Sequence, residues 1–360
     1  MPDTPFPHEA RADLPGVPFS AMRAAILAQA RETKLTVLED GADHLTVETA
    51  HGLIGLRPGV EAETAGMVAA RDARWLFVMK SAVIAQMRQM MPAVAEAMRW
   101  SESEAPGSLP PNFQFVRATR VERLGRVFLR VTLQGEDLSA YGDAAIHFRL
   151  VQPPRETEPA WPSVGANGST VWPEGPGAPH KPVYTVRHID HDTNTLETDV
   201  FIHAGGRTTA WAEEIIAGER DRRIVGLVGP AGAGLLDAER VIIASDETGF
   251  PAAARLLDGL QAGATGRVIL EAEHGADCAY PITIPPGLEV TWLARAKGQR
   301  LGALALEALG DWSGHTIWFA GEKGDAKRLR DAAKAAGWEA GQLRVSGFWK
   351  RPEEHGAETA

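Results

Sequence analysis

The sequence predicts a multidomain protein that combines a small N-terminal α+β domain, an antiparallel β-barrel domain and a parallel α/β domain. Three observations support this prediction. The chain has 360 residues, which is enough for two or three typical domains. Short strand patterns rich in β-branched residues fill its middle part. From about residue 240, nearly apolar strands alternate with helices, as in a parallel sheet covered on both faces.

The N-terminal α+β domain is expected over residues 1–107. Helical spacing of apolar residues predicts a helix over 19–33 and a longer one over 75–100, which Pro92 kinks or splits in two. Between these helices lie three short strand patterns, LTVLED, HLTVETA and LIGLRPG. The segment SESEAPGSLPPN is rich in Ser, Pro and Gly, so it marks a domain boundary near residues 101–112.

The other two domains are expected over residues 108–236 and 237–352, with a tail over 353–360. The middle domain contains a meander of about six strands, consistent with a small barrel. A loop rich in Pro, Gly and Trp over 152–181 interrupts these strands, and TTAWAEEIIAG predicts a short helix. In the C-terminal domain, ligands are expected beyond the carboxyl ends of the parallel strands.

Composition and charge exclude several classes of protein. Hydrophobic residues make up 44% and charged residues 23% of the chain, which argues against a disordered or fibrous protein. The formal net charge of −10 predicts no extensive nucleic-acid-binding surface. Cys278 is the single cysteine, so one chain builds no disulfide, iron–sulfur cluster or cysteine zinc site. With no signal peptide and no apolar run of about 18 residues, we expect a cytoplasmic protein without a membrane span.

Common cofactor and metal motifs are missing from the sequence. The stretch GPAGAGLL, which begins at Gly229, lacks the third glycine of a dinucleotide fingerprint and the Gly-Lys-Ser/Thr of a phosphate loop. Neither HExxH nor GxSxG is present. His188 and His191 fall where two strands turn, which favours a solvated turn over a metal site. We therefore expect no protein-bound metal, and any redox chemistry needs an organic cofactor.

Two stretches of the middle domain carry groups suited to such a cofactor. The run Tyr184-Thr185-Val186-Arg187 lies in a strand, and its aromatic ring and hydroxyl suit stacking on a flat ring and bonding to its edge; an ordinary strand is the competing interpretation. In HAGGRTTAWAEE, which begins at His203, glycines turn the chain and Thr208 or Thr209 caps a helix. The N–H groups at a helix start bind phosphate, although a cap without a ligand fits the pattern equally well.

Polar residues also follow three strands of the predicted parallel sheet. Each group alone fits a loop, but the carboxyl ends of parallel strands meet at one edge, where a cofactor crevice is expected. We therefore predict cofactor contacts at five of these positions: Asp246, Glu247, Thr248, Gly321 and Glu322. After the last strand, Lys350 and Arg351 are expected to form a local basic patch for an anionic substrate. The alternative interpretation is that they are solvated charges of the tail.

Taken in order, these motifs resemble the siderophore-interacting proteins, which are FAD-dependent ferric-siderophore reductases of the ferredoxin-reductase superfamily. The resemblance covers residues 112–352 and rests on RVFLRVTLQGEDL with IHFRLVQPP, YTVR, DVFIHAGG with TTAWA, GLVGPAG, ASDETGFPA, WFAGE and SGFWKR. It implies a flavin-binding β-barrel followed by a nucleotide-binding α/β domain. The N-terminal domain resembles a small α+β domain of unknown function, mainly through HGLIGLRPG, and we infer no activity from it.

The resemblance also implies residue roles. Tyr184 is expected against the flavin isoalloxazine ring with Thr185 near its N5 edge, and the FAD pyrophosphate is expected at His203, Gly206, Thr208 and Thr209. The superfamily has an arginine two residues before this tyrosine, but here that residue is Pro182. We expect Lys181 or Arg207 to supply the missing positive charge.

The implied function is reduction of ferric siderophores or ferric chelates with electrons from NADH or NADPH, passed through FAD. The alternatives are a flavin reductase that serves a ferredoxin-type partner, and a siderophore-binding or partner-recruiting module without significant turnover. For the nucleotide, Glu271, Glu273 and Asp277 near the end of the second parallel strand favour the ribose hydroxyls of NADH. The competing interpretation is that Arg295 or Lys297 receives the 2′-phosphate of NADPH.

Overall fold

The computed structural model describes residues 5–33, 35–60 and 63–351, so the predicted tail over 353–360 lies outside the described residues. The chain divides into two compact units. The first combines the chain up to Phe115 with Arg149–Pro182 and Val225–Gly229, and the second combines Val116–Phe148, Val183–Ile224 and the chain from Pro230 onward. Within these described ranges, no helix is both long and apolar enough to cross a membrane.

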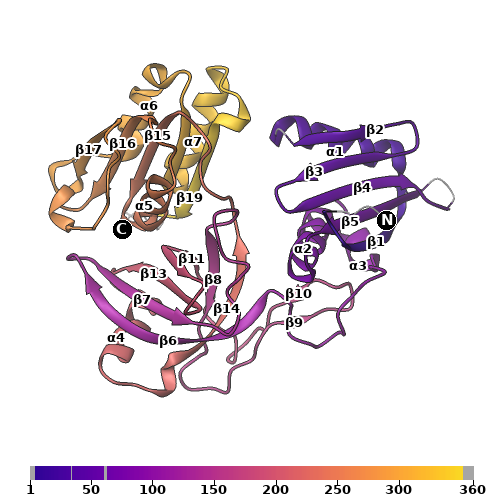
Figure 1. Ribbon diagram of the computed structural model, residues 1–360, viewed down its shortest axis with the longest axis horizontal. Coiled ribbons are helices and arrows are strands. Elements are labelled where there is room, and N and C mark those ends of the chain that lie inside the picture. Colours follow the sequence, from indigo (N-terminus) through magenta and orange to yellow (C-terminus); the bar gives the residue numbers. More distant parts are fainter. Residues whose placement is uncertain (1–4, 34, 61–62, 352–360) are drawn as a thin grey trace, which may run out of the picture. The chain divides into compact units, whose positions relative to one another are not determined.

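An antiparallel five-stranded sheet in the order β1-β5-β4-β3-β2 forms the α+β region (Figure 1). Its strands are β1 (His8–Pro18), β2 (Thr36–Asp40), β3 (Leu45–Thr49), β4 (Gly52–Pro58) and β5 (Glu63–Ala70). The helices are α1 (Phe19–Thr33), α2 (Ala73–Met90) and α3 (Pro92–Ala97). Pro92 is the first residue of α3, where its missing N–H costs no helical hydrogen bond, and the predicted split of the long helix is confirmed.

Two strands of this sheet, β1 and β5, are absent from the strand patterns predicted above. β5 reads ETAGMVAA and β1 reads HEARADLPGVP, so both use alanine, glycine or proline where strands usually carry β-branched residues. The alternation is nevertheless present in β1, because Ala10, Ala12 and Leu14 are buried and the residues between them are exposed. Small side chains hide this period-two pattern from a propensity-based prediction.

The predicted antiparallel domain contains a seven-stranded sheet in the order β11-β8-β14-β6-β7-β13-β12. Its strands are β6 (Phe113–Leu124), β7 (Phe128–Gln134), β8 (His147–Val151), β11 (Val183–Thr185), β12 (His188–Asp190), β13 (Thr195–Phe201) and β14 (Ile224–Ala231). The long loop contains a separate two-stranded pairing of β9 (Ser163–Val164) with β10 (Thr170–Val171). The helix α4 (Arg207–Ile216) follows β13, as the sequence predicts.

A parallel five-stranded sheet in the order β17-β16-β15-β18-β19 forms the C-terminal domain, which confirms the predicted α/β class (Figure 1). Its strands are β15 (Arg240–Asp246), β16 (Thr265–Ala272), β17 (Leu288–Ala294), β18 (Thr316–Glu322) and β19 (Leu343–Trp349). Its helices are α5 (Phe250–Asp258), α6 (Leu301–Glu307) and α7 (Lys323–Ala335), with a 3₁₀ turn η3 (Glu247–Gly249) before α5.

Both faces of this parallel sheet are covered by apolar side chains. Val241 and Ile243 of β15 belong to a buried cluster with residues of α5. Ile242 and Ala244 belong to a second cluster with residues of α6 and α7. Because alternate residues of one strand point to opposite faces, two clusters on one strand require helices on both sides, which explains the nearly continuous apolar strands of this domain.

A buried charge network links the seven-stranded sheet to the α/β domain. Arg130 of β7 and Asp199 of β13 are directly opposite each other, and their side chains form a two-pronged ion pair with distances of 2.7 and 2.9 Å. The hydroxyl of Tyr280, from the loop after β16, donates a hydrogen bond to Asp199 Oδ2 at 2.7 Å. Asp199 is only 2% exposed, so these donors replace the water that its carboxylate would otherwise bind.

We predict that Tyr280→Phe lowers the free energy of unfolding by about 1.5 kcal/mol, because a hydrogen bond to a buried charged acceptor is lost while the packed ring is kept. Urea denaturation followed by circular dichroism measures the change. Arg120→Ala is the matched control: it removes an exposed ion pair with Glu122 in the same sheet and should change stability by less than about 0.5 kcal/mol. A Tyr280→Phe protein as stable as wild type would contradict the role given to this network.

Candidate functional site

The strand β11 and the start of α4 meet at a hydrogen bond. The hydroxyl of Tyr184 pairs with the side chain of Thr208, and burial raises the pKa of Tyr184 to about 12. The residue as a whole is only partly buried. The structure therefore brings together two of the predicted cofactor-binding residues, one from a strand and one from a helix start, through a contact that the sequence did not predict.

The start of α4 differs from the prediction that Thr208 or Thr209 caps this helix. The cap position is Gly206, which has no side chain to accept from the first turn, and both threonines lie inside the helix and are buried. A Cβ on Gly206 would stand 2.9 Å from Thr209 Oγ1 and 3.0 Å from His203 Nε2, so a larger residue would displace these two side chains. Gly205 has a φ of +73°, a conformation that glycine adopts without strain.

These groups fit the phosphate end of FAD by their chemistry. Because Gly206 offers no capping oxygen, the backbone N–H groups at the start of α4 have no side-chain partner from the cap position. N–H groups at a helix start bind anions through hydrogen bonds and the helix dipole. The exposed guanidinium of Arg207, at the first position of α4, adds N–H donors and a positive charge at the same place.

The two cations expected to replace the missing arginine are in different environments. Lys181 Nζ lies 4.9 Å from the centre of the Trp172 ring, a cation–π contact. Arg207 is exposed at the first position of α4, and its side chain makes no hydrogen bond or ion pair with the described residues. Arg187, predicted to contact the cofactor, forms an ion pair with Asp258 of α5 at 2.6 Å, a contact that the sequence did not predict.

His147 was not among the predicted site residues, although it stands in the motif IHFRLVQPP. Its Nδ1 lies 3.4 Å from the hydroxyl of Thr185, and burial lowers the pKa of its imidazole despite a hydrogen bond to the Tyr184 backbone. The ring of Phe348, from β19, packs edge-on against the His147 ring at a centroid distance of 6.0 Å. His147 thus connects the predicted flavin pair to the last strand of the α/β domain.

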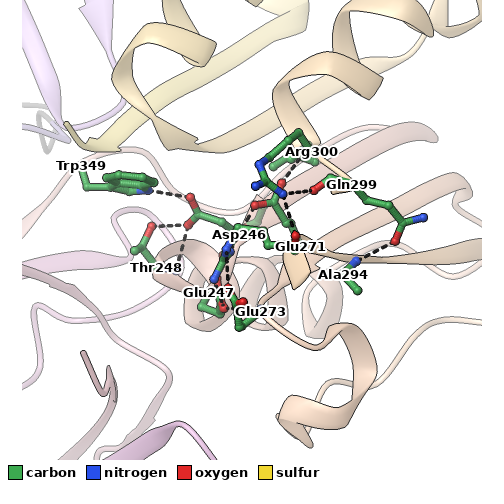
Figure 2. Close-up of polar contacts among 12 residues, drawn as sticks. Asp246, Glu247, Thr248, Glu271, Glu273, Ala294, Gln299, Arg300 and Trp349 are labelled. Carbon is green, nitrogen blue, oxygen red and sulfur yellow. Dashed lines mark hydrogen bonds and ion pairs between the residues drawn. The ribbon is translucent and has the colours of Figure 1, made fainter. Parts of the chain in front are cut away.

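Asp246 and Thr248, at the carboxyl end of β15, are joined to the end of β19. The indole Nε1 of Trp349 donates to Asp246 Oδ2 at 2.6 Å, while the backbone N–H and hydroxyl of Thr248 donate to Oδ1 at 3.0 and 2.6 Å. Figure 2 shows Trp349 and Thr248 approaching the carboxylate from two sides. Burial raises the pKa of Asp246 to about 6, against the effect of these hydrogen bonds.

Glu247 is held by Arg295, which follows β17. The guanidinium contacts Glu247 through two bonds of 2.6 Å, Glu271 at 3.2 Å and Glu273 at 3.4 Å. Burial opposes ionisation of Arg295, but the bonds to Glu247 and Glu271 raise the pKa of its guanidinium. Glu271 also accepts from the Leu301 N–H, so both of its oxygens are engaged.

Glu322 is the last residue of β18, next to Gly321 at the carboxyl edge of the sheet. Its Oε2 accepts from the N–H groups of Gly324 and Asp325 and caps α7, while its Oε1 accepts from the Arg351 N–H at 3.2 Å. Burial would raise the pKa of this carboxyl, but the three backbone donors lower it below its ordinary value. Lys350 and Arg351 are exposed, and the Arg351 guanidinium lies 5.9 Å from the centre of the Trp349 ring.

The predicted residues thus form two groups, one at β11 and α4 and one along the carboxyl edge of the parallel sheet. The partners that hold the second group, Arg295 and Trp349, were not predicted as such. Arg295 directly follows the strand β17. A residue at the carboxyl end of a parallel strand is a candidate for the ligand edge of the sheet, and this position is the only indication of its role that the sequence gives. Among residues 5–33, 35–60 and 63–351, no cluster of His, Cys, Asp or Glu has the arrangement of a metal site.

Comparisons with known proteins agree with this architecture. The model of the siderophore-interacting FAD-binding domain matches residues 117–234, and that of the siderophore-interacting protein matches residues 238–352. The chain is 28% identical to the NADPH-dependent ferric-chelate reductase of Escherichia coli over 246 residues, 66% of this chain and 92% of that protein. It is 30% identical to the ferric vibriobactin reductase ViuB of Vibrio cholerae over 205 residues, 55% of this chain and 71% of that protein.

A solved structure from the same kind of protein also matches this chain. The siderophore utilization protein from T. fusca superposes with a TM-score of 0.56 at 27% sequence identity, covering 69% of this chain and 96% of the other. The two family models together span most of the chain and follow the order of its seven-stranded and parallel sheets. Through residues 117–352, this chain therefore belongs to the siderophore-interacting protein family.

Proposed function

We propose that this protein is a FAD-dependent NAD(P)H oxidoreductase that reduces ferric siderophores or ferric chelates. One observation carries the proposal: the contact series Thr185–His147–Phe348. It connects the residue expected at the flavin N5 edge to β19, the strand that Lys350 and Arg351 directly follow. The names of the two curated relatives, both ferric reductases, support the same reaction class.

The chain's own residues bind and orient the reactants. When bound, FAD accepts two electrons from a nicotinamide nucleotide and releases them singly, which suits a one-electron acceptor such as Fe(III). Tyr184 and Thr185 offer a ring and a hydroxyl to the flavin, and the α4 start with Arg207 offers N–H donors and a cation to the diphosphate. Of the two candidate cations we favour Arg207, because Lys181 is already paired with Trp172.

The substrate is proposed to dock at Lys350 and Arg351. The protein is acidic overall, with a net charge of −10, so an anionic ferric chelate needs a local positive field. Siderophores hold Fe(III) more tightly than Fe(II), so reduction releases the metal and the protein needs no iron ligands of its own. We place this reaction in the cytoplasm, where NAD(P)H is available.

For the nucleotide, the ion pairs at the sheet edge favour a structural role for Arg295 over the role of phosphate receptor. Three carboxylates surround its guanidinium, and Glu271 is buried and bonded at both oxygens. The carboxylate of Glu273 is 59% exposed at the same edge and is the acidic group best placed to contact a ribose. We therefore keep NADH as the expected donor, although one relative is named for NADPH.

The proposed reaction is tested by turnover of ferric–EDTA, an anionic chelate, with NADH or NADPH and added FAD, followed with a ferrous indicator dye. Lys350→Ala/Arg351→Ala should raise the KM for this chelate about tenfold and flatten its dependence on salt, because two nearby charges are removed. Absence of turnover with either nucleotide, together with efficient reduction of a ferredoxin, would favour the alternative reductase. Unchanged kinetics of the double variant would contradict the docking residues only.

The flavin site is tested by FAD titration of purified apoprotein. Tyr184→Ala should weaken FAD binding about tenfold or more, the range of lost aromatic stacking, whereas Tyr184→Phe keeps the ring and should lose much less. Arg207→Ala should weaken binding in a salt-dependent way, with Lys181→Ala as the matched cation control. Full flavin content and a normal visible spectrum in Tyr184→Ala would show that the ring does not contact the flavin.

Arg295→Ala should mainly affect stability. Removing the guanidinium leaves Glu247 and Glu271 buried without their partner, which should lower the free energy of unfolding by about 3 kcal/mol. Arg267→Ala, which removes an exposed pair with Glu289 in the same domain, should cost less than about 0.5 kcal/mol. If Arg295→Ala is stable and specifically loses activity with NADPH, Arg295 is a phosphate receptor after all.

A further inference from the structure

Two carboxylates at the carboxyl edge of the parallel sheet divide their oxygen atoms in the same way. In Asp246, Oδ1 accepts from the N–H and hydroxyl of Thr248 and caps η3, while Oδ2 accepts from Trp349 Nε1. In Glu322, Oε2 accepts from two N–H groups and caps α7, while Oε1 accepts from the Arg351 N–H. In each residue, one oxygen caps a helical turn and the other accepts a hydrogen bond from the end of β19 or from the residues just after it.

The segment held in this way carries the proposed substrate cations. Trp349 is fixed through its indole, Arg351 through its backbone, and Lys350 lies between them. The Arg351 guanidinium lies over the Trp349 ring, so fixing the ring also limits the positions of this cation. Both carboxylates are less than one-tenth exposed, so water competes little for these bonds.

We infer that Asp246 and Glu322 are positioning residues that hold residues 349–351 in place and thereby orient Lys350 and Arg351 toward an anionic ferric chelate. The inference rests on the proposed function. Its physical basis is preorganisation: a side chain that is already ordered loses less conformational entropy when the ligand binds. Both residues were predicted to contact the cofactor, but the oxygens of both are engaged within the protein.

Trp349→Phe isolates the positioning contact. It removes the N–H that donates to Asp246 Oδ2, keeps an aromatic ring under Arg351, and leaves both helix caps intact. Trp338→Phe is the matched control, because this partly buried tryptophan of the same domain makes no indole hydrogen bond with the described residues. Glu322→Gln is a second variant: a single amide oxygen serves either the α7 cap or the Arg351 N–H, but not both.

Binding is measured by calorimetric titration with gallium–EDTA, which has the charge of ferric–EDTA but is not reduced. We expect Trp349→Phe to weaken this binding, and to raise the KM for ferric–EDTA, by about three- to tenfold, while kcat and FAD content change much less. Glu322→Gln should act in the same direction, and Trp338→Phe should match wild type. Added to Lys350→Ala/Arg351→Ala, Trp349→Phe should cause no further loss, because the groups it positions are gone.

The outcomes separate the two proposals. If Trp349→Phe and Glu322→Gln bind gallium–EDTA as wild type does while the double alanine variant binds weakly, the positioning role is wrong and the docking residues stand. If the double variant also binds normally, the docking residues and the positioning role both fail. If the wild-type protein binds gallium–EDTA and Trp349→Phe binds it more weakly, but no ferric chelate is reduced, the proposed function is overturned and the positioning of a bound anion is supported.

Discussion

Four buried carboxylates at one edge of the parallel sheet impose the constraint on which the rest of this region depends. Asp246, Glu247, Glu271 and Glu322 are each at most 9% exposed, and an ionised carboxylate removed from water costs several kcal/mol unless donors replace the lost hydration. The donors come from several elements and include the guanidinium after β17, the indole at the end of β19, the first N–H groups of η3 and α7, and the N–H groups of Leu301 and Arg351. Residues at the end of β15 therefore depend on donors at the ends of β17 and β19 to remain buried.

The sequence predicted where these polar groups lie but not what they bind. The local patterns of apolar strands and helices define the carboxyl edge of the sheet, so the sequence predicts Asp246, Glu247 and Glu322 at that edge. Their partners are set by tertiary pairing: Glu247 and Arg295 are 48 residues apart, and Asp246 and Trp349 are 103 apart. No local period reports contacts of that range. The same limit applies to β1 and β5, whose small residues form strands because β5 pairs with β4 on one side and with the edge strand β1 on the other.

Ion pairs hold the α/β domain to the strands that carry the candidate flavin residues, within the second unit. Arg187 beside β11 contacts Asp258, and Arg255 contacts Asp143, so the C-terminal turn of α5 is held by two ion pairs. Asp199 of β13 is bonded to Tyr280 from the other side. The run Tyr184–Arg187 therefore has two roles. Tyr184 and Thr185 are the candidate ligand contacts, and Arg187 holds this strand against α5 through its ion pair with Asp258.

The way in which Asp246 and Glu322 hold residues 349–351 also preserves the charge of the proposed docking cations. Glu322 binds Arg351 through its backbone N–H, and Asp246 binds the neutral indole of Trp349, so the positioning bonds are made with uncharged donors. A two-pronged ion pair to the Arg351 guanidinium would have ordered the same segment while neutralising the field that an anionic chelate needs. Instead, the guanidinium lies over an aromatic ring, where its charge is retained. An acidic protein can in this way use buried acids to present a basic patch.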